Sequence, residues 1–183
     1  MNTVVLYTSH YGATERYARA LAAALGAPCF ALGEEDVQAV HRAGRIVYGG
    51  GLYAGGVAGL CRAKKYFSGK DVFLFTVGLA QTQQQAVRDE IERQVQRGLG
   101  PRQSLAPGRL FCLRGAFCFE KLGLVHKTMM RMMRRMLLKK GGGMTQDDRA
   151  LLAAFRTPVD FVDVSALAPL VKACGVPYRE AGK

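Results

Sequence analysis

The chain has 183 residues, of which 49% are hydrophobic and 22% are charged, a composition typical of folded globular proteins and not of disordered ones. Its net charge of +12 favours anionic partners, such as nucleic acid, membrane headgroups or a polyacidic ligand. The sequence shows no secretory signal and no run of about 20 apolar residues, so we expect a cytoplasmic protein without a transmembrane helix. The length predicts a single domain over residues 1–183. Five scattered cysteines without a CxxC pair argue against a disulfide framework or a metal site and predict reduced, mostly buried thiols.

Strand and helix signals alternate through the first 119 residues. Runs of apolar and β-branched residues predict strands at 3–8, 29–32, 45–49, 71–77 and 109–119. The spacing of apolar residues predicts helices at 15–25, 34–43, 57–67 and 84–97, with loops at 49–56 and 98–108. This alternation indicates βαβ units, so the expected fold class is α/β, with a doubly wound, five-stranded parallel sheet. Ligands of such sheets bind at the carboxyl ends of the strands.

The pattern changes after the fifth strand. A long helix is predicted at 122–139, three glycines at 141–143 end it, and residues 145–148 indicate a turn and a cap. A short strand at 161–164 and a helix at 165–174 follow. We therefore expect the domain to carry a basic, amphipathic helical insertion at about 120–145.

The loop after the first strand has the features of an anion site. Its hydroxyl side chains, its glycine and the helix N-terminus that follows would direct backbone N–H groups and the helix dipole to one point. It lacks the lysine of a nucleotide-triphosphate loop, and it is not the GxGxxG of a dinucleotide site. The residues alone leave two interpretations open, phosphate binding and simple capping of the helix by Ser9 and Thr14. The residues concerned are Ser9, His10, Tyr11, Gly12, Ala13 and Thr14.

This loop resembles the flavodoxin pattern Thr/Ser-x-Thr-Gly-x-Thr, which cradles the phosphate of FMN directly after the first strand. Gly12 and Thr14 match the pattern, whereas Tyr11 stands where a threonine is usual. The resemblance implies a flavodoxin-like sheet of strand order 2-1-3-4-5 and FMN as the cofactor. It also implies that the segments after the third and fourth strands cover the two sides of the isoalloxazine ring. The ring-binding residues would be Gly51, Leu52, Tyr53, Ala54 and Gly55 in the first segment and Leu79, Ala80 and Gln81 in the second.

The first of these segments is unusually rich in glycine. Residues 49–56 include five glycines, more than a turn requires, and glycine lets the backbone approach a flat ring. Tyr53 either stacks on the flavin or is a partly exposed loop aromatic.

A basic segment follows the sheet. Residues 121–140 carry seven basic side chains and no acidic one. On a helix, five of them fall within an arc of about 140°, and most of the apolar side chains, chiefly methionines, lie opposite. The pattern fits a membrane-interface helix, and it also fits a surface helix whose methionines pack into the core. The basic face would contact an anionic substrate or membrane surface through Lys127, Arg131, Arg134, Arg135 and Lys139.

The chain as a whole resembles the menaquinone-dependent protoporphyrinogen oxidase branch of the flavodoxin-like proteins. The resemblance lies in the segment 127–136, in the glycine turn 141–145 and in the segment 48–55. It implies an FMN-dependent oxidoreductase that oxidises protoporphyrinogen IX or a related reduced tetrapyrrole, with menaquinone or another quinone as acceptor. It also implies a peripheral position on the inner face of the cell membrane. The flavin would carry the chemistry, in keeping with a sequence that shows no Ser-His-Asp, Cys-His or carboxylate pair.

Other functions account for the sequence less well. A flavodoxin-type electron carrier without its own substrate is usually acidic, because it docks on basic partners, and this chain is strongly basic. A flavin-dependent quinone reductase would need a nicotinamide site, and we find no such pattern. A nucleic-acid-binding protein would interleave aromatic residues with its basic ones, so we do not expect nucleic acid as a partner. Self-association into a homo-oligomer through the methionine-rich face stays open.

Overall fold

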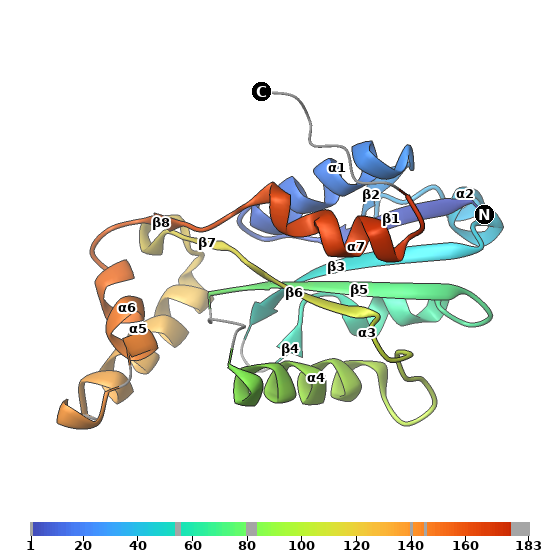
Figure 1. Cartoon of the computed structure of the whole chain (residues 1–183). Helices are drawn as coiled ribbons and strands as arrows, with labels where there is room; N and C mark the ends of the chain where they lie inside the picture. The colour runs from blue at the N-terminus through green and yellow to red at the C-terminus, as the bar shows by residue number, and fades with distance from the viewer. Residues whose placement is uncertain (1, 54–55, 80–83, 140, 145, 177–183) are drawn as a thin grey trace.

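A mostly parallel sheet forms the centre of the protein in the computed structural model, which describes residues 2–53, 56–79, 84–139, 141–144 and 146–176 (Figure 1). Its parallel strands are β1 (Thr3–Thr8), β2 (Cys29–Ala31), β3 (Arg45–Tyr53), β5 (Asp71–Gly78) and β6 (Leu110–Arg114). They lie side by side in the order β2-β1-β3-β5-β6. The predicted α/β class and the order 2-1-3-4-5 are therefore confirmed.

The central strands are covered on both faces, which explains their continuous apolar runs. Val4, Val5 and Leu6 point to alternate faces of β1, and all three are fully buried. Val5 pairs with Cys29 of β2 on one side and with Val47 of β3 on the other. A strand in this position has no solvent-facing row, so its sequence shows no polar alternation.

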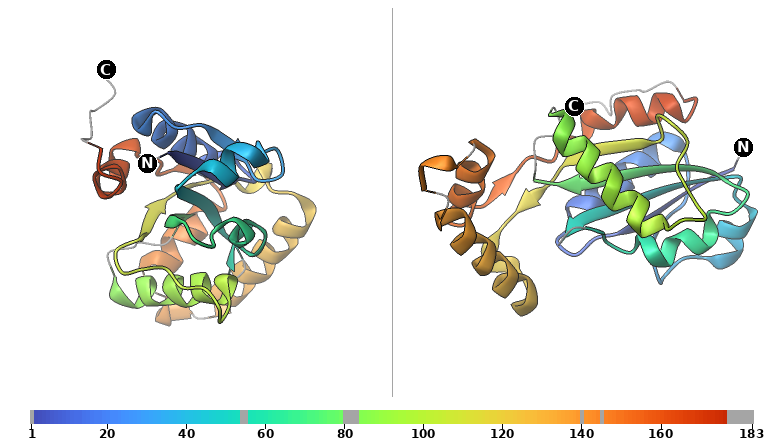
Figure 2. Two further views of the ribbon diagram at one scale, coloured as in Figure 1. Left: turned by 90° about the vertical axis from the view of Figure 1, so that its right-hand side faces the viewer. Right: turned by 90° about the horizontal axis from the view of Figure 1, so that it is seen from below.

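Helices cover the two faces of the sheet as separate layers, each with its own hydrophobic core (Figures 1 and 2). One layer consists of α1 (Ala13–Leu25), the 3₁₀ turn η4 (Val164–Leu167) and α7 (Ala168–Ala173). The other consists of α2 (Val37–Arg42), α3 (Leu60–Ala63), the 3₁₀ turn η1 (Lys64–Tyr66) and α4 (Gln85–Leu99). The three-layer arrangement is the expected one, although the predicted helix 165–174 begins as the 3₁₀ turn η4.

The third strand and the segment after it differ from the prediction. The strand was expected to end at Gly49, but β3 continues to Tyr53, because its last residues pair with the short antiparallel strand β4 (Gly56–Val57). The predicted helix 57–67 is correspondingly wrong at its start: only residues from Leu60 onward are helical, and they divide into α3 and η1. Sequence periodicity could not show this hairpin, since glycine carries no side chain with which to mark a strand face.

The chain leaves the sheet after β6 and forms a projecting unit at the carboxyl ends of the strands (Figures 1 and 2). We call residues 116–160 the inserted unit. Its elements are β7 (Ala116–Phe117), the 3₁₀ turn η2 (Phe119–Lys121), α5 (Leu124–Lys139), the 3₁₀ turn η3 (Gly141–Gly143), α6 (Gln146–Ala154) and β8 (Val159–Asp160). Strands β7 and β8 pair antiparallel and close the unit at its base.

Three predictions about this region need correction. The fifth strand was expected to run over 109–119, but it is interrupted at Gly115, whose N–H donates to the carbonyl of Gly78 at 2.8 Å. Residues 145–148 were expected as a turn and cap, but residues 146–148 form the first turn of the helix α6, and residue 145 lies outside the described residues. The short strand expected at 161–164 lies instead at Val159–Asp160, because it pairs with β7.

The cysteines are less buried than predicted. All five are free thiols, but Cys174 alone is buried and Cys61 is exposed, so the expectation of mostly buried thiols is wrong. Within the part of the chain that the structure describes, no helix has the length and apolar character needed to cross a bilayer.

Candidate functional site

The loop between β1 and α1 forms an open turn around Gly12. Gly12 has φ +88°, a left-handed conformation that glycine adopts without strain, and it is the N-cap residue of α1. Its N–H donates to the Ser9 hydroxyl at 3.1 Å, which closes the turn. A Cβ added to Gly12 would have no protein atom within 4 Å, so there is free space beside the loop. The loop therefore combines a fixed backbone with room for a ligand.

No side chain at the N-cap position bonds the first turn of α1, because the cap residue is a glycine. The Ser9 hydroxyl accepts the N–H of Gly12 itself, so it closes the turn before the helix and does not cap an N–H of α1. Thr14 is instead buried. The first N–H groups of a helix lack partners within the helix and attract anions. The acidic residue of the first turn, Glu15, is paired with Arg19 at 2.7 Å, which offsets the repulsion it would exert on an anion.

The segment expected to bind the flavin ring lies at the end of β3. Gly51, Leu52 and Tyr53 belong to the strand, where Leu52 pairs with Val57 of β4. Leu79, which follows β5, packs against the core of the inserted unit. Ala54, Gly55, Ala80 and Gln81 lie outside the described residues.

Four rings from three distant segments meet at this end of the sheet: His10, Tyr11, Tyr53 and His126. Tyr53 and His126 are stacked, with ring centroids 5.4 Å apart and an interplanar angle of 27°. His10 meets the edge of Tyr53 at 5.2 Å and lies 5.6 Å from His126. Burial raises the pKa of Tyr53 to about 12, and Tyr11 adds to the rise, so Tyr53 is a neutral aromatic surface at physiological pH. We call these four residues the ring cluster.

A hydrogen bond joins the loop after β1 to the inserted helix. The Tyr11 hydroxyl lies 2.5 Å from Nδ1 of His126, and it accepts the N–H of Gly123 at 3.3 Å. Tyr11 is the position at which the loop departs from the flavodoxin pattern. A threonine would be too short to reach α5, so the larger side chain gives this loop a contact with the inserted unit.

Sequence reasoning missed His126 as a residue of the site. One signal was present: His126 is the only histidine in a helix that is otherwise rich in methionine and basic residues. At about 100° per residue it falls beside Met130 and Leu137, which are buried residues of α5. Its partner Tyr11, however, is far away in the sequence.

The buried side chain of Tyr48 makes a second set of contacts next to the site. The Tyr48 hydroxyl donates to the carbonyl of Ala58 at 2.6 Å and lies 2.9 Å from the hydroxyl oxygen of Thr8. Tyr48 is fully buried, and burial raises its pKa to about 12. These bonds join Thr8, at the end of β1, to Tyr48 of β3 and to Ala58, the residue after β4.

Helix α5 carries three different stripes. His126, Met130 and Leu137 face the rest of the protein. The predicted apolar face is only partly buried, since Met132 and Met136 are 63% and 60% exposed. Of the two interpretations of this helix, the one that packs its methionines into the core does not hold for Met132 and Met136.

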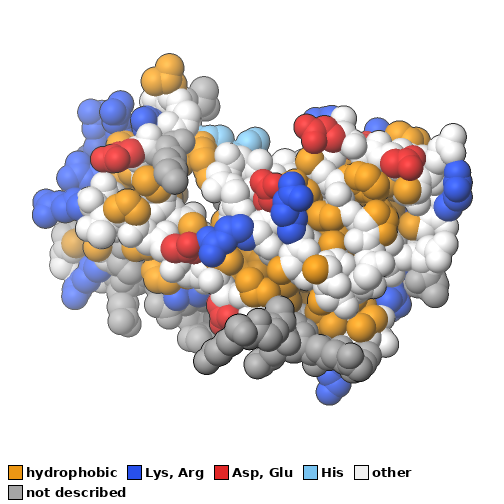
Figure 3. Space-filling model, turned by 90° about the horizontal axis from the view of Figure 1, so that it is seen from above, with side chains coloured by type: hydrophobic (Ala, Val, Ile, Leu, Met, Phe, Trp, Pro, Cys, Tyr) orange, Lys and Arg blue, Asp and Glu red, His pale blue; other side chains and the backbone are white. Residues whose placement is uncertain are grey.

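The third stripe is basic, and Figure 3 shows Lys and Arg side chains gathered at the end of the molecule that the inserted unit forms. Lys127 is half-buried, and the other four basic residues of the stripe are exposed. They are Arg131, Arg134, Arg135 and Lys139.

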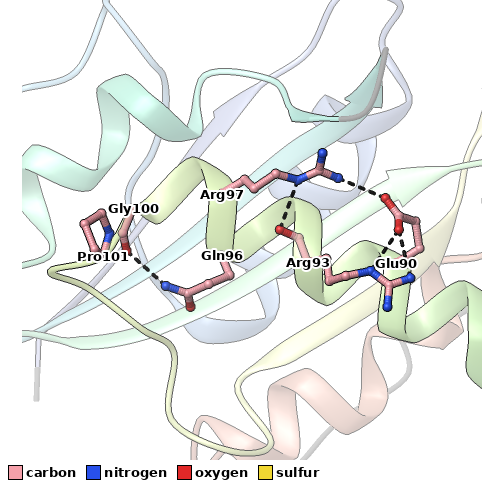
Figure 4. A pocket seen from close by; sticks show the side chains of 6 residues that line it. All are labelled: Glu90, Arg93, Gln96, Arg97, Gly100 and Pro101. Atoms are coloured by element: carbon pink, nitrogen blue, oxygen red, sulfur yellow. Dashed lines mark hydrogen bonds and ion pairs between the residues drawn. The ribbon is translucent and has the colours of Figure 1, made fainter.

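An open groove of about 750 Å³ lies elsewhere, along the outer side of α4 (Figure 4). Its two arginines, Arg93 and Arg97, are both paired with Glu90 at 2.9 Å. Their charges are therefore engaged, and the groove offers no feature of a flavin site.

Comparison with known proteins places this geometry in context. Residues 4–144 match the family described as flavodoxin domain. No curated protein matches the sequence. Three solved structures are similar to this chain at low sequence identity.

A flavodoxin, WrbA-like protein from Agrobacterium tumefaciens is 18% identical over 85% of this chain and 98% of that one, with a TM-score of 0.47. A putative flavoprotein from Bacteroides uniformis is 15% identical over 71% and 97%, with a TM-score of 0.45. Flavodoxin 1 from Bacillus cereus is 11% identical over 62% and 84%, with a TM-score of 0.38.

The residues present fit FMN, the cofactor that the family match implies. The Gly12 turn and the first N–H groups of α1 would hold the phosphate, in the space that a Cβ on Gly12 would fill. The end of β3 and the aromatic surface of Tyr53 would lie against the ring system.

Proposed function

Because the chain belongs to the flavodoxin family, we propose that it is an FMN-dependent oxidoreductase that oxidises a reduced tetrapyrrole, such as protoporphyrinogen IX, with a quinone as acceptor. When bound, FMN supplies the transfer of hydride equivalents and electrons. The chain's own residues bind the cofactor, orient the substrate and limit the access of water.

The observation that carries this proposal is the attachment of a basic helix to the cofactor end of the sheet. His126 is hydrogen-bonded to Tyr11 and stacks on Tyr53, and its neighbour Lys127 begins the basic stripe of α5. A tetrapyrrole with propionate groups presents carboxylates beside an extended apolar ring system. A basic stripe next to the ring cluster suits such a substrate, because it provides charge for the carboxylates and aromatic surface for the rings.

The two edges of the basic stripe face different surroundings, and we assign a different partner to the residues of each edge. At about 100° per residue, Lys127 and Arg134 lie next to the protein-facing side of α5. Arg135 and Lys139 lie next to the exposed Met132. We propose that the first pair contacts the substrate carboxylates, and that the second pair, with the exposed methionines, contacts an anionic membrane surface that contains the quinone.

The main alternative is an electron carrier without its own substrate. Such a carrier would need the FMN loops but no basic helix beside them. The net charge of +12 and its concentration in residues 121–140 therefore favour the enzyme. A quinone reductase that uses a nicotinamide donor is the second alternative, and it differs from the proposal in its reductant.

The proposal can be tested with protein reconstituted with FMN. Anaerobic addition of protoporphyrinogen IX should bleach the flavin absorption, and a menaquinone analogue should restore it. Lys127→Gln should raise the KM for the porphyrinogen several-fold and leave the Kd for FMN unchanged. Lys172→Gln, which removes the same charge from an exposed position on α7, is the matched control and should have no effect. Bound FMN that porphyrinogen does not reduce would contradict the enzyme and leave the electron carrier.

A further inference from the structure

The inserted unit contacts this end of the sheet through the ring cluster and through Leu79. Two of the three histidines of the chain, His10 and His126, lie 5.6 Å apart at this point, although they come from opposite parts of the sequence. His126 also stacks on Tyr53 and bonds to Tyr11. One residue of α5 therefore contacts both the segment assigned to the phosphate and the segment assigned to the ring.

Two hydrogen bonds hold the hydroxyl of Tyr11 at the start of α5. The N–H of Gly123 donates to the Tyr11 oxygen at 3.3 Å. The same oxygen lies 2.5 Å from Nδ1 of His126, and the tautomer of the imidazole sets which of the two groups is the donor. Both backbone and side chain of the start of α5 thus hold the same hydroxyl. Tyr11 immediately precedes Gly12, whose turn carries the open space beside the helix N-terminus.

We propose that His126 is a positioning residue of the FMN site, which acts through Tyr11, and that cofactor binding and the seating of α5 stabilise each other. The bond from His126 restricts Tyr11 and with it the turn at Gly12, so less freedom is lost when the phosphate binds. The inference rests on FMN as the cofactor of the proposed function, and it does not depend on the identity of the substrate.

The effect of the seated helix on FMN binding and the effect of FMN on the seating of the helix must be equal in size. If the seated helix improves the binding of FMN by some factor, FMN improves the seating of the helix by the same factor. The net contribution of one neutral hydrogen bond corresponds to a change of about 3- to 10-fold in the Kd for FMN. The consequence for the molecule is that the basic stripe of α5 is held in place most firmly when the flavin is bound.

Four variants and one control test the inference. His126→Leu removes the ring nitrogen that bonds to Tyr11, Tyr11→Phe removes only the hydroxyl, and the double variant removes both. His126→Asn returns a polar group near the position of Nδ1. The control is His41→Leu, since His41 also packs edge-on against a tyrosine, Tyr66, at 5.9 Å, in the layer of α2 and α3.

Two measurements are made on each variant: the Kd for FMN from the change in flavin fluorescence, and the amide hydrogen exchange of α5 with and without FMN. We expect His126→Leu and Tyr11→Phe each to raise the Kd about 3- to 10-fold, and the double variant to raise it no further than either one. His126→Asn should recover part of the loss, and His41→Leu should match the wild type. FMN should slow the exchange of α5 in the wild type and have little effect on it in His126→Leu.

Each opposite result overturns the inference. Wild-type Kd values in Tyr11→Phe, additive losses in the double variant, or exchange of α5 that ignores FMN would show that the contact plays no part in binding. Tyr11→Phe keeps the ring and its packing, so its result does not depend on a disturbed fold. FMN that binds normally to every variant overturns this inference alone, whereas a wild type that binds no FMN overturns the proposed function with it.

Discussion

Adding one methyl group to the turn at Gly12 should separate its role in the fold from its role in FMN binding. Gly12 and Gly26 lie at the two ends of α1, both have positive φ, +88° and +59°, and a Cβ at either would meet no protein atom within 4 Å. Alanine in a left-handed conformation costs about 1–2 kcal/mol, at either position. For a chain of this size that lowers the Tm by about 2–8 °C, so Gly12→Ala and Gly26→Ala should be destabilised alike.

Only the Gly12 variant should lose FMN. Its methyl group would occupy the space beside the first N–H groups of α1 and separate the phosphate from at least one of them. A hydrogen bond to a charged group contributes about 1.5–3 kcal/mol, so the Kd should rise about 10- to 100-fold. Titration of flavin fluorescence, well below the Tm of both variants, measures the effect. Equal FMN affinities in Gly12→Ala and Gly26→Ala would refute the phosphate assignment of this loop.

Three further predictions concern the inserted helix and the support of the site. Replacement of Arg135 and Lys139 by Gln should weaken sedimentation with phosphatidylserine vesicles and preserve the Kd for FMN, and vesicle binding that survives unchanged would contradict the proposed membrane contact. Met132→Asp should weaken vesicle binding without lowering the Tm, because that side chain is 63% exposed; a clear loss of Tm would show instead that it packs inside the protein. Burial raises the pKa of Tyr48 to about 12, above its value near 10 in the unfolded chain, so the unfolded chain loses this proton first. The free energy of unfolding should therefore fall between about pH 10 and pH 12, by up to about 3 kcal/mol, and urea unfolding should show a shallower fall in Tyr48→Phe. Identical pH profiles would argue against this titration.

The sheet could be predicted from local sequence because its strands are buried on both faces. A run such as 3–8 cannot be a half-exposed strand or an amphipathic helix, and helices between such runs force a parallel arrangement. The errors occur where a strand depends on a partner that the sequence does not identify. Gly50 and Gly51 extend β3 because they pair with β5, and residues 52–53 extend it further because β4 folds back on them. Strand β8 lies at 159–160 because β7 pairs with it there.

The loop to which we assign the phosphate could also be predicted from the sequence, since a loop, a glycine and a helix N-terminus are neighbours along the chain. The amphipathic pattern of α5 predicted its basic stripe, but not which apolar residues would be buried. Burial of Met130 and exposure of Met132 depend on which side of the helix meets the body of the protein.

The α/β class and the chemical character of the β1–α1 loop and of the basic helix could be predicted from the sequence, and the strand order followed from the family resemblance. The contact between Tyr11 and His126, and the stacking of Tyr53 on the same histidine, are seen only in the folded structure. The physical reason is that local patterns reflect backbone preference and burial, which neighbouring residues set together. A contact between the first loop and the inserted helix depends instead on where the folded sheet places these two distant segments, and no local sequence pattern indicates that position.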